Sequence, residues 1–299
     1  MESLVLALLA TLVFAVPQGG EATSLLGKAL RRPAVADTAR ASLEQNLADA
    51  VAQRRLRPTD VDAWIWVGRR TAYLGRFRDA AAVYTEALGR FGANAELLRH
   101  RGHRYLTLRQ IDLAIADFEQ AARMIEGTED ELEADGAPNA KNQPTSTLHF
   151  NVWYHLGLAR YLQGDLRAAR KAFEACRRVS FNPDAKVASA YWLALIGAGE
   201  GDWKGVEASL RLFTRDTNII ENHAYLRLVL HFKGDLPEGE LLDGASGVLD
   251  NPTTRFGLAA WMRAKGRSTE ARAMLEGIVA GDNWPAFGFL AAEATLARW

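Results

Sequence analysis

The chain of 299 residues has little cysteine, little proline and no net charge. Its one cysteine, Cys176, excludes an internal disulfide, a CxxC redox pair and a cysteine-rich zinc site. Basic and acidic residues number 36 each, which gives no electrostatic reason to expect nucleic acid as a partner. The 9 prolines against 25 glycines, in a sequence rich in alanine and leucine, favour helices separated by glycine turns.

The sequence also lacks the short motifs of common enzymes, namely HExxH, GxSxG and GxxxxGKS/T. His100 and His103 have a spacing that suits a metal, but neighbouring arginines disfavour a divalent cation there. Cys176 stands in a column of small residues and is expected to pack in the core. We therefore predict no catalytic residue, no metal site and no cofactor.

One short apolar run stands at the start of the chain. Residues 3–16, SLVLALLATLVFAV, are 14 residues without a charge. A membrane-spanning helix requires about 20 apolar residues, whereas the core of a signal peptide has about 7 to 15. We therefore predict a signal peptide over residues 1–22, cleaved after Ala15 or Ala22, and a periplasmic or extracellular protein without stable membrane insertion. The alternative is an uncleaved anchor, since Glu2 stands where a basic residue is expected.

A period of 34 residues runs through the middle of the chain. Four columns share the spacings 34 and 55: Gly68, Gly102 and Gly157; Ala80, Ala114 and Ala169; Tyr84, Phe118 and Phe173; Ala87, Ala121 and Cys176. The difference indicates an insertion of 21 residues between the second and third units. Each unit contains two helical patterns, residues 63–74 and 78–90 in the first, joined by a glycine turn. The turn glycine is Gly75 in the first unit and recurs as Gly164, Gly201, Gly234 and Gly266.

These units resemble the tetratricopeptide repeat family. The matching residues are Trp64, Val67, Gly68, Gly75, Phe77, Ala80, Tyr84 and Ala87; Leu98, Gly102, Tyr105, Ala114, Phe118 and Ala121; and Trp153, Leu156, Gly157, Gly164, Ala169 and Phe173. The resemblance implies an all-α, right-handed superhelical solenoid of about six helix-turn-helix repeats, whose first helices line a concave groove. In the weaker later units, Ala194 and Ala259 keep the small residue of the first helix. Arg227 breaks this column and puts the close helix packing of its unit in doubt.

The period divides the chain into segments. Residues 23–60 are predicted as an N-terminal capping helix or half-repeat, and residues 281–299 as a C-terminal capping helix. The solenoid covers residues 61–280, with clear repeats at 61–94, 95–128 and 150–183. An acidic loop is inserted at 129–149, and degenerate repeats occupy 187–280.

Seven residues on the side of the first helices away from their second helices are predicted to bind a partner. They are Arg69, Tyr73, Arg99, His103, Asn151, Tyr154 and Tyr161. The arginines and His103 suit a carboxylate or the acidic end of a peptide, and the tyrosines suit aromatic anchoring. The opposing interpretation is the solvated surface of an ordinary repeat. The Lys/Asn set with which some family members grip a C-terminal carboxylate is absent, so that specificity is not expected.

The insertion at residues 129–149 has an acidic first half and a second half rich in turn residues. We expect it either to fold back towards Arg69, Arg99 and His103, as a lid or part of the binding surface, or to remain a solvated loop. The sequence as a whole predicts a non-enzymatic, exported scaffold that binds a protein or peptide in its groove. The alternatives are an enzyme or enzyme subunit that uses the 129–149 loop near His103, and a structural protein that self-associates through its end surfaces.

Overall fold

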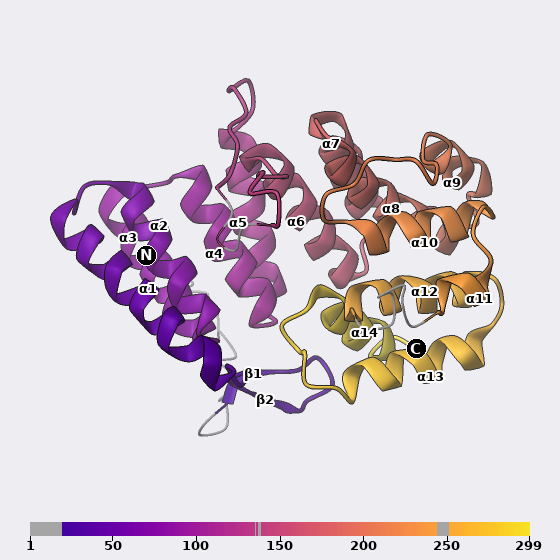
Figure 1. Ribbon diagram of the computed structural model, residues 1–299, viewed down its shortest axis with the longest axis horizontal. Helices are drawn as coiled ribbons and strands as arrows, with labels where there is room; N and C mark the ends of the chain where they lie inside the picture. Colours follow the sequence, from indigo (N-terminus) through magenta and orange to yellow (C-terminus); the bar gives the residue numbers. More distant parts are fainter. Residues whose placement is uncertain (1–19, 135, 137–138, 244–250) are drawn as a thin grey trace, which may run out of the picture.

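The computed structural model describes residues 20–134, 136, 139–243 and 251–299 (Figure 1). A hairpin of β1 (Gly20–Thr23) and β2 (Ala29–Arg31) is followed by helices α1 (Asp37–Leu56), α2 (Val61–Tyr73), α3 (Phe77–Phe91), α4 (Ala95–Thr107), α5 (Ile111–Met124), α6 (Leu148–Gln163), α7 (Leu166–Val179), α8 (Pro183–Glu200), α9 (Trp203–Leu210), α10 (His223–Lys233), α11 (Glu238–Leu241), α12 (Pro252–Ala264), α13 (Ser268–Val279) and α14 (Phe287–Leu296). The apolar run at residues 3–16 lies outside the described residues.

The helices pack as successive pairs, α2 with α3, α4 with α5, α6 with α7, α8 with α9, and α12 with α13. Helix α1 packs against α2 at the start of this series, and α14 packs against α12 and α13 at its end. These two helices lie in the segments that the sequence assigns to N-terminal and C-terminal caps. The all-α solenoid of helix pairs is confirmed.

Direct packing explains the periodic glycines. In each clear repeat a ring of the second helix lies on the glycine of the first: Tyr84 on Gly68, Phe118 on Gly102 and Phe173 on Gly157. A Cβ atom on these glycines would lie 2.3, 2.9 and 2.8 Å from the respective ring. Such distances are too short for carbon atoms in contact. The glycine column and the aromatic column are therefore one packing unit, repeated three times.

The unit that contains Arg227 departs from this pattern, as its sequence indicates. Its first helix, α10, is followed within the described residues by α11, which has only 4 residues. The Arg227 side chain takes the place of a small residue, and its Nη2 donates a 2.6 Å hydrogen bond to the Glu240 carbonyl oxygen. This bond attaches the short helix to α10.

Helix α8 forms the centre of the C-terminal half, because it is apolar on every side and almost completely buried. It packs against α7, α9, α10 and α12. None of the helices in the described part of the chain combines the length and the apolar character that crossing a membrane requires.

The hairpin at residues 20–31 was not predicted. Ala22 is buried, and the buried Glu21 accepts a 2.9 Å hydrogen bond from the backbone N–H of Arg78 at the start of α3. The boundary predicted after residue 22 therefore falls inside β1, and cleavage there would remove most of this strand from its partner. A cleavage after Ala15 would leave the hairpin intact.

Candidate functional site

The first helices of the three clear repeats, α2, α4 and α6, lie in sequence beside one another, and we call the side away from their second helices the first-helix face. The predicted partner-binding residues are Arg69 and Tyr73 on α2, Arg99 and His103 on α4, and Asn151, Tyr154 and Tyr161 on α6. Tyr73 is 36% exposed and Arg69 is half-buried. Arg99, Asn151 and Tyr154 are buried. These three residues lack the exposure that direct contact with a partner requires, because other parts of the chain cover them.

The inserted segment at residues 129–149 folds back onto α4 and α6 through Glu133. One oxygen of the Glu133 carboxylate lies 3.0 Å from Nη2 of Arg99, and the other accepts a 2.8 Å hydrogen bond from Nδ2 of Asn151. His100 accepts a 3.0 Å bond from Nη1 of Arg99 at Nδ1, so its neutral ring carries the proton on Nε2, 3.5 Å from the same carboxylate. The expectation that the insertion folds back towards Arg99 is confirmed, and a fully solvated loop is wrong for this part.

Gly136 of the insertion covers the adjacent surface of α2. Its carbonyl oxygen accepts a 3.1 Å hydrogen bond from Nη1 of Arg70. A Cβ atom on Gly136 would lie 1.7 Å from the Tyr73 hydroxyl and 2.9 Å from Nη2 of Arg69. The insertion therefore lies against both predicted contact residues of α2.

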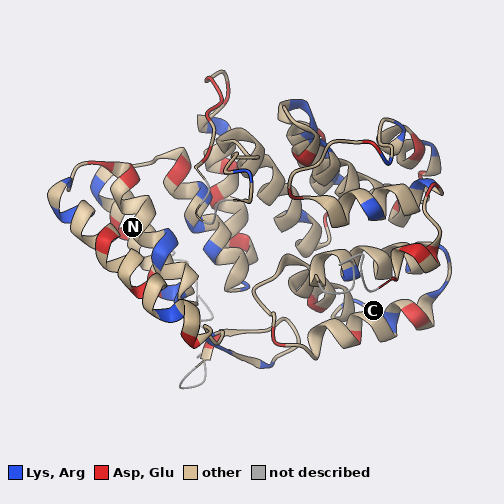
Figure 2. Ribbon diagram, in the orientation of Figure 1, with Lys and Arg blue, Asp and Glu red and all other residues tan. Residues whose placement is uncertain are grey.

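Three guanidinium groups gather on the first-helix face, and we call Arg69, Arg99 and Arg104 the arginine cluster. Figure 2 shows charges of both signs interspersed along the helices of the whole molecule. The arginine cluster, by contrast, contains charges of one sign. Burial and the neighbouring positive charges of Arg99 and Arg69 lower the pKa of Arg104 to about 10. Glu133 is the one carboxylate of the described residues that forms an ion pair with the cluster. Nε of Arg99 is buried without a hydrogen-bond partner.

Arg104 was missed in the sequence, although it follows His103 directly in the basic run of α4. Its guanidinium carbon lies 5.4 Å from the centre of the Phe77 ring, at the start of α3. The side chain also lies close enough to Arg99 and Arg69 for their charges to act on its pKa.

Acidic side chains adjoin the cluster at the other end of α4. Burial raises the pKa of Glu96, and the negative charges of Asp62, Glu131 and Glu133 raise it further. The docked insertion therefore brings two carboxylates close to Glu96, which also lies near Asp62. Attraction at Arg99 and repulsion at Glu96 act on the same short segment.

Three histidines lie next to the arginine cluster and are neutral at pH 7. Burial, with the positive charge of Arg99, lowers the pKa of His155 to about 3. Burial also lowers the pKa of His100 and of His103 well below the ordinary value. The ring centre of His103 is 4.7 Å from that of His155 and 5.1 Å from that of Phe287 in α14. Among the described residues, the ring of His103 therefore packs against His155 and against Phe287 of the C-terminal helix.

The predicted aromatic anchors of α6 belong to the core. The Tyr154 hydroxyl accepts a 2.8 Å hydrogen bond from Nε1 of Trp192 and lies 3.4 Å from the hydroxyl of Tyr225. The Tyr161 ring packs against Trp192 and Phe256, with centres 5.2 and 6.0 Å away. Helices α8, α10 and α12 thus occupy this part of the face, and the anchoring role predicted for the two tyrosines does not fit their surroundings.

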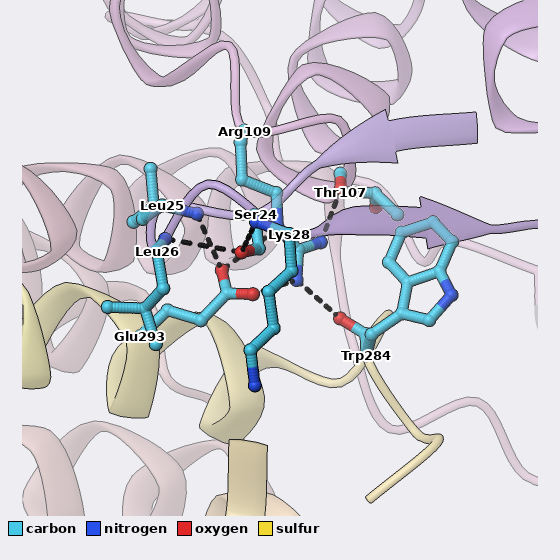
Figure 3. Close-up of polar contacts among 8 residues, drawn as sticks. All are labelled: Ser24, Leu25, Leu26, Lys28, Thr107, Arg109, Trp284 and Glu293. Atoms are coloured by element: carbon cyan, nitrogen blue, oxygen red, sulfur yellow. Dashed lines mark hydrogen bonds and ion pairs between the residues drawn. The ribbon is translucent and has the colours of Figure 1, made fainter. Parts of the chain in front are cut away.

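The N-terminal hairpin and the turn of the second repeat meet the C-terminal helix α14 at a buried ion pair (Figure 3). Arg109, in the turn between α4 and α5, donates from Nε and Nη2 to the two oxygens of Glu293 in α14, at 3.1 and 3.2 Å. It also donates to the carbonyl oxygens of Thr107 and Trp284, at 2.6 and 2.9 Å. The backbone N–H of Leu25, from the hairpin, points at Glu293 Oε2 from 3.4 Å. We call these five residues the closing joint.

The closing joint uses an unusual backbone position. Arg109 has φ of +64° in the turn where Gly75, one repeat earlier, has φ of +71°. A side chain in this conformation is strained by about 1 kcal/mol relative to glycine. Trp284 extends the joint, because its Nε1 donates a 2.7 Å hydrogen bond to the Arg31 carbonyl oxygen of β2. The turn of the second repeat thus carries an arginine that binds α14, at the position where the other turns carry glycine.

Among the residues that the structure describes, no three His, Cys, Asp or Glu side chains gather as they would around a metal ion. Cys176 is buried in the repeat column, and burial raises the pKa of its thiol.

Comparison with known proteins agrees with this geometry. Residues 150–182 match a family model described as the tetratricopeptide repeat. The fold is similar to a tetratricopeptide repeat protein from Parabacteroides merdae, with 15% identity, a TM-score of 0.50 and coverage of 86% of this chain and 94% of that one. A thermophilic tetratricopeptide repeat protein of Thermus thermophilus gives 18% identity, a TM-score of 0.41 and coverage of 79% and 100%. No curated protein matched the chain. One repeat of the chain thus matches the tetratricopeptide repeat model, and the chain as a whole shares the fold of a tetratricopeptide repeat protein.

Proposed function

We propose that this chain is an exported, non-enzymatic scaffold that binds an acidic segment of a protein partner on its first-helix face. The tetratricopeptide fold is that of a protein-interaction scaffold. The arginine cluster supports the finer assignment, because among the described residues a carboxylate pairs with only one of its three guanidinium groups, that of Arg99. Charge-assisted hydrogen bonds to half-buried arginines are stronger than those to solvated ones, which favours a carboxylate ligand.

Arg69 and Arg104 are the residues that we assign to the partner. Arg99 instead holds Glu133 and is too buried to serve as a first contact. Trp66 adds an aromatic surface, since the guanidinium carbons of Arg69 and Arg70 lie 4.5 and 4.8 Å from its ring. The partner segment that fits this surface carries carboxylates and an adjacent apolar or aromatic side chain.

Replacing Arg69 and Arg104 together by glutamine is expected to weaken the binding of an acidic peptide at least about tenfold, since each change removes a charged donor. The probe is a fluorescein-labelled decapeptide of aspartate, glutamate and one tyrosine, and the measurement is fluorescence anisotropy. A lysine-containing decapeptide of equal length serves as the control probe.

The matched control carries Arg167→Gln and Arg211→Gln. Both of these arginines are exposed, one in α7 and the other at the end of α9, and the control changes the net charge by the same amount. It is expected to bind the acidic peptide as the parent chain does. Equal affinity of the Arg69/Arg104 variant and the parent, at unchanged thermal stability, would reject the assignment.

Export is supported by the apolar run at residues 3–16, which has the length of a signal-peptide core. The hairpin favours the earlier of the two cleavage sites, because Ala22 is buried within β1. N-terminal sequencing of the secreted chain is expected to read from Val16. A first residue of Thr23 would show that the hairpin is dispensable, and an intact first methionine would support the anchor instead.

A further inference from the structure

The strongest further observation is that the acidic segment on the arginine cluster belongs to the chain itself. The segment is held at its base by an antiparallel pairing, in which the Glu133 N–H donates to Ser146 and the Leu148 N–H donates to Glu131, each at 3.0 Å. The pairing aims the Glu133 side chain at α4 and α6. Its carboxylate is only 15% exposed and has donors from both helices.

The contacts of this segment are those that a bound acidic peptide would make. Glu133 meets a guanidinium and an amide, as a carboxylate ligand does. Further along the same segment, the Gly136 carbonyl oxygen accepts from Arg70, and the glycine lies against Tyr73 and Arg69. The insertion therefore occupies the surface that the proposed function assigns to a partner.

The docking of the segment is opposed by like charges. Glu131 and Glu133 approach Glu96, and their charges, with that of Asp62, contribute to the raised pKa of Glu96. Nε of Arg99 has no partner although it is buried. An optimised permanent contact leaves neither like charges together nor a buried donor without a bond. The docked state is thus only moderately favoured over the released one.

We propose that the segment around Glu133 is an internal ligand, which competes with an acidic partner segment for the arginine cluster and so regulates access to it. This inference rests on the proposed function, because it uses the same surface. The measured affinity for a partner is then the intrinsic affinity reduced by the fraction of molecules whose insertion is released. The partner is an extended peptide with a glutamate or aspartate that replaces Glu133.

Two substitutions release the segment by different means. Glu133→Gln removes the charge that pairs with Arg99 and keeps an acceptor for Asn151. Gly136→Val adds side-chain atoms where a Cβ alone would lie 1.7 Å from the Tyr73 hydroxyl. Each is expected to tighten the binding of the acidic decapeptide roughly tenfold. Glu129→Gln, an exposed position of the same insertion, is the charge-matched control and is expected to change the affinity less than about twofold.

The internal ligand is also tested in trans. A synthetic peptide of residues 129–136, EDELEADG, is expected to bind the Glu133→Gln chain and to bind the parent chain more weakly. The same peptide with glutamine in place of Glu133 is expected to bind neither. Adding Arg69→Gln and Arg104→Gln to the Glu133→Gln chain is expected to abolish the binding.

Hydrogen exchange separates this inference from the proposed function. Binding of the decapeptide to the parent chain is expected to speed exchange at the amides of Glu133 and Leu148, which are protected by the pairing at the base of the insertion. Arginine-dependent binding with both amides still protected, and without tighter binding by either release variant, overturns the internal ligand and leaves the proposed function standing. Absence of binding even to both release variants overturns the proposed function as well.

Discussion

Replacing Glu293 by glutamine is expected to lower the free energy of unfolding by about 3 to 5 kcal/mol, because it leaves a buried guanidinium without its counter-charge. The Glu293 side chain is fully buried and that of Arg109 is 3% exposed. Burial raises the pKa of Glu293 and lowers the pKa of Arg109, in each case against the opposing charge of the partner. Both directions show that desolvation opposes the pair. Removing the charge of one partner alone therefore leaves the other charge buried without compensation and lowers the stability of the fold.

The same reasoning predicts a strong coupling between the two residues. Arg109→Met and Glu293→Met are each expected to be destabilising, but the double variant is expected to lose less than the sum of the two. The double variant still loses stability, because the carbonyl oxygens of Thr107 and Trp284 lose their donor. Urea unfolding followed by circular dichroism measures the four free energies. Additive losses would show that the ion pair is not what connects the turn of the second repeat to α14.

Further variants separate the contribution of the Arg109 side chain from the strain of its backbone. Arg109→Gly removes the side chain and also relieves the positive φ, so it is expected to be more stable than Arg109→Ala by about 1 kcal/mol. Glu276→Gln removes one partner of an exposed pair with Arg272 in α13 and is the control for a change of charge. The control is expected to unfold as the parent does.

The repeat architecture was predictable because it rests on local, periodic packing. Gly68, Gly102 and Gly157 are required by rings at a fixed distance along the chain, so the spacing alone reveals them. The doubt over the unit of Arg227 was also a local inference, and the four-residue α11 agrees with it. Periodicity within one unit carries this information without any knowledge of distant segments.

The state of the first-helix face was not predictable in the same way. Periodicity shows which side of α6 points away from α7, but not that α8, α10 and α12 cover Tyr154 and Tyr161. The contact between His103 and Phe287 joins residues far apart in the sequence, as does the closing joint. Such contacts depend on how segments distant in the sequence pack together, which periodicity within one unit does not reveal. The hairpin was not predicted for a related reason, because its strands are short and are held in place by α3 and by the closing joint.

The insertion was the most informative feature that the sequence left open. Its acidic first half and the basic run of α4 suggested an attraction, and the two segments do meet at Glu133 and Arg99. Which carboxylate meets which arginine depends on the backbone pairing at Leu132 and Thr147, which composition does not reveal. The charges therefore indicated that the insertion folds back towards α4, and the backbone pairing determines which of its residues meets Arg99.

Lowering the pH from 6.5 to 5 is expected to destabilise the fold, by about 2 kcal/mol through His155 and further through His100 and His103, the other two histidines next to the arginine cluster. Their pKa values in the folded chain lie below the ordinary 6.5, and that of His155 lies at about 3. The unfolded chain therefore binds protons more tightly. The stability that His100, His103 and His155 contribute is present above pH 6.5 and is lost as the pH falls towards the folded values.

The structure gives the physical reason for this sensitivity. Nδ1 of His155 donates a 2.6 Å hydrogen bond to the Asn151 carbonyl oxygen, so protonation adds a charge at Nε2. That charge would face Arg99 and Arg104 and would be enclosed by the rings of His103 and Phe287. Glu133 is the counter-charge nearest to His100, but it is already paired with Arg99. Because burial raises the pKa of Glu293, that group favours the fold in acid, and the window above pH 5 limits its contribution.

Urea unfolding between pH 7.5 and pH 5 tests this prediction, with tryptophan fluorescence and circular dichroism as independent probes. His155→Gln keeps a donor for the Asn151 carbonyl and cannot be protonated, so it is expected to reduce the slope of stability against pH by about 1.4 kcal/mol per unit. His223→Gln, at an exposed position in the first turn of α10, is the control and is expected to keep the slope of the parent. Stability that does not change across this range would mean that the histidines are solvated in the folded chain, and with them the arginine cluster that surrounds them.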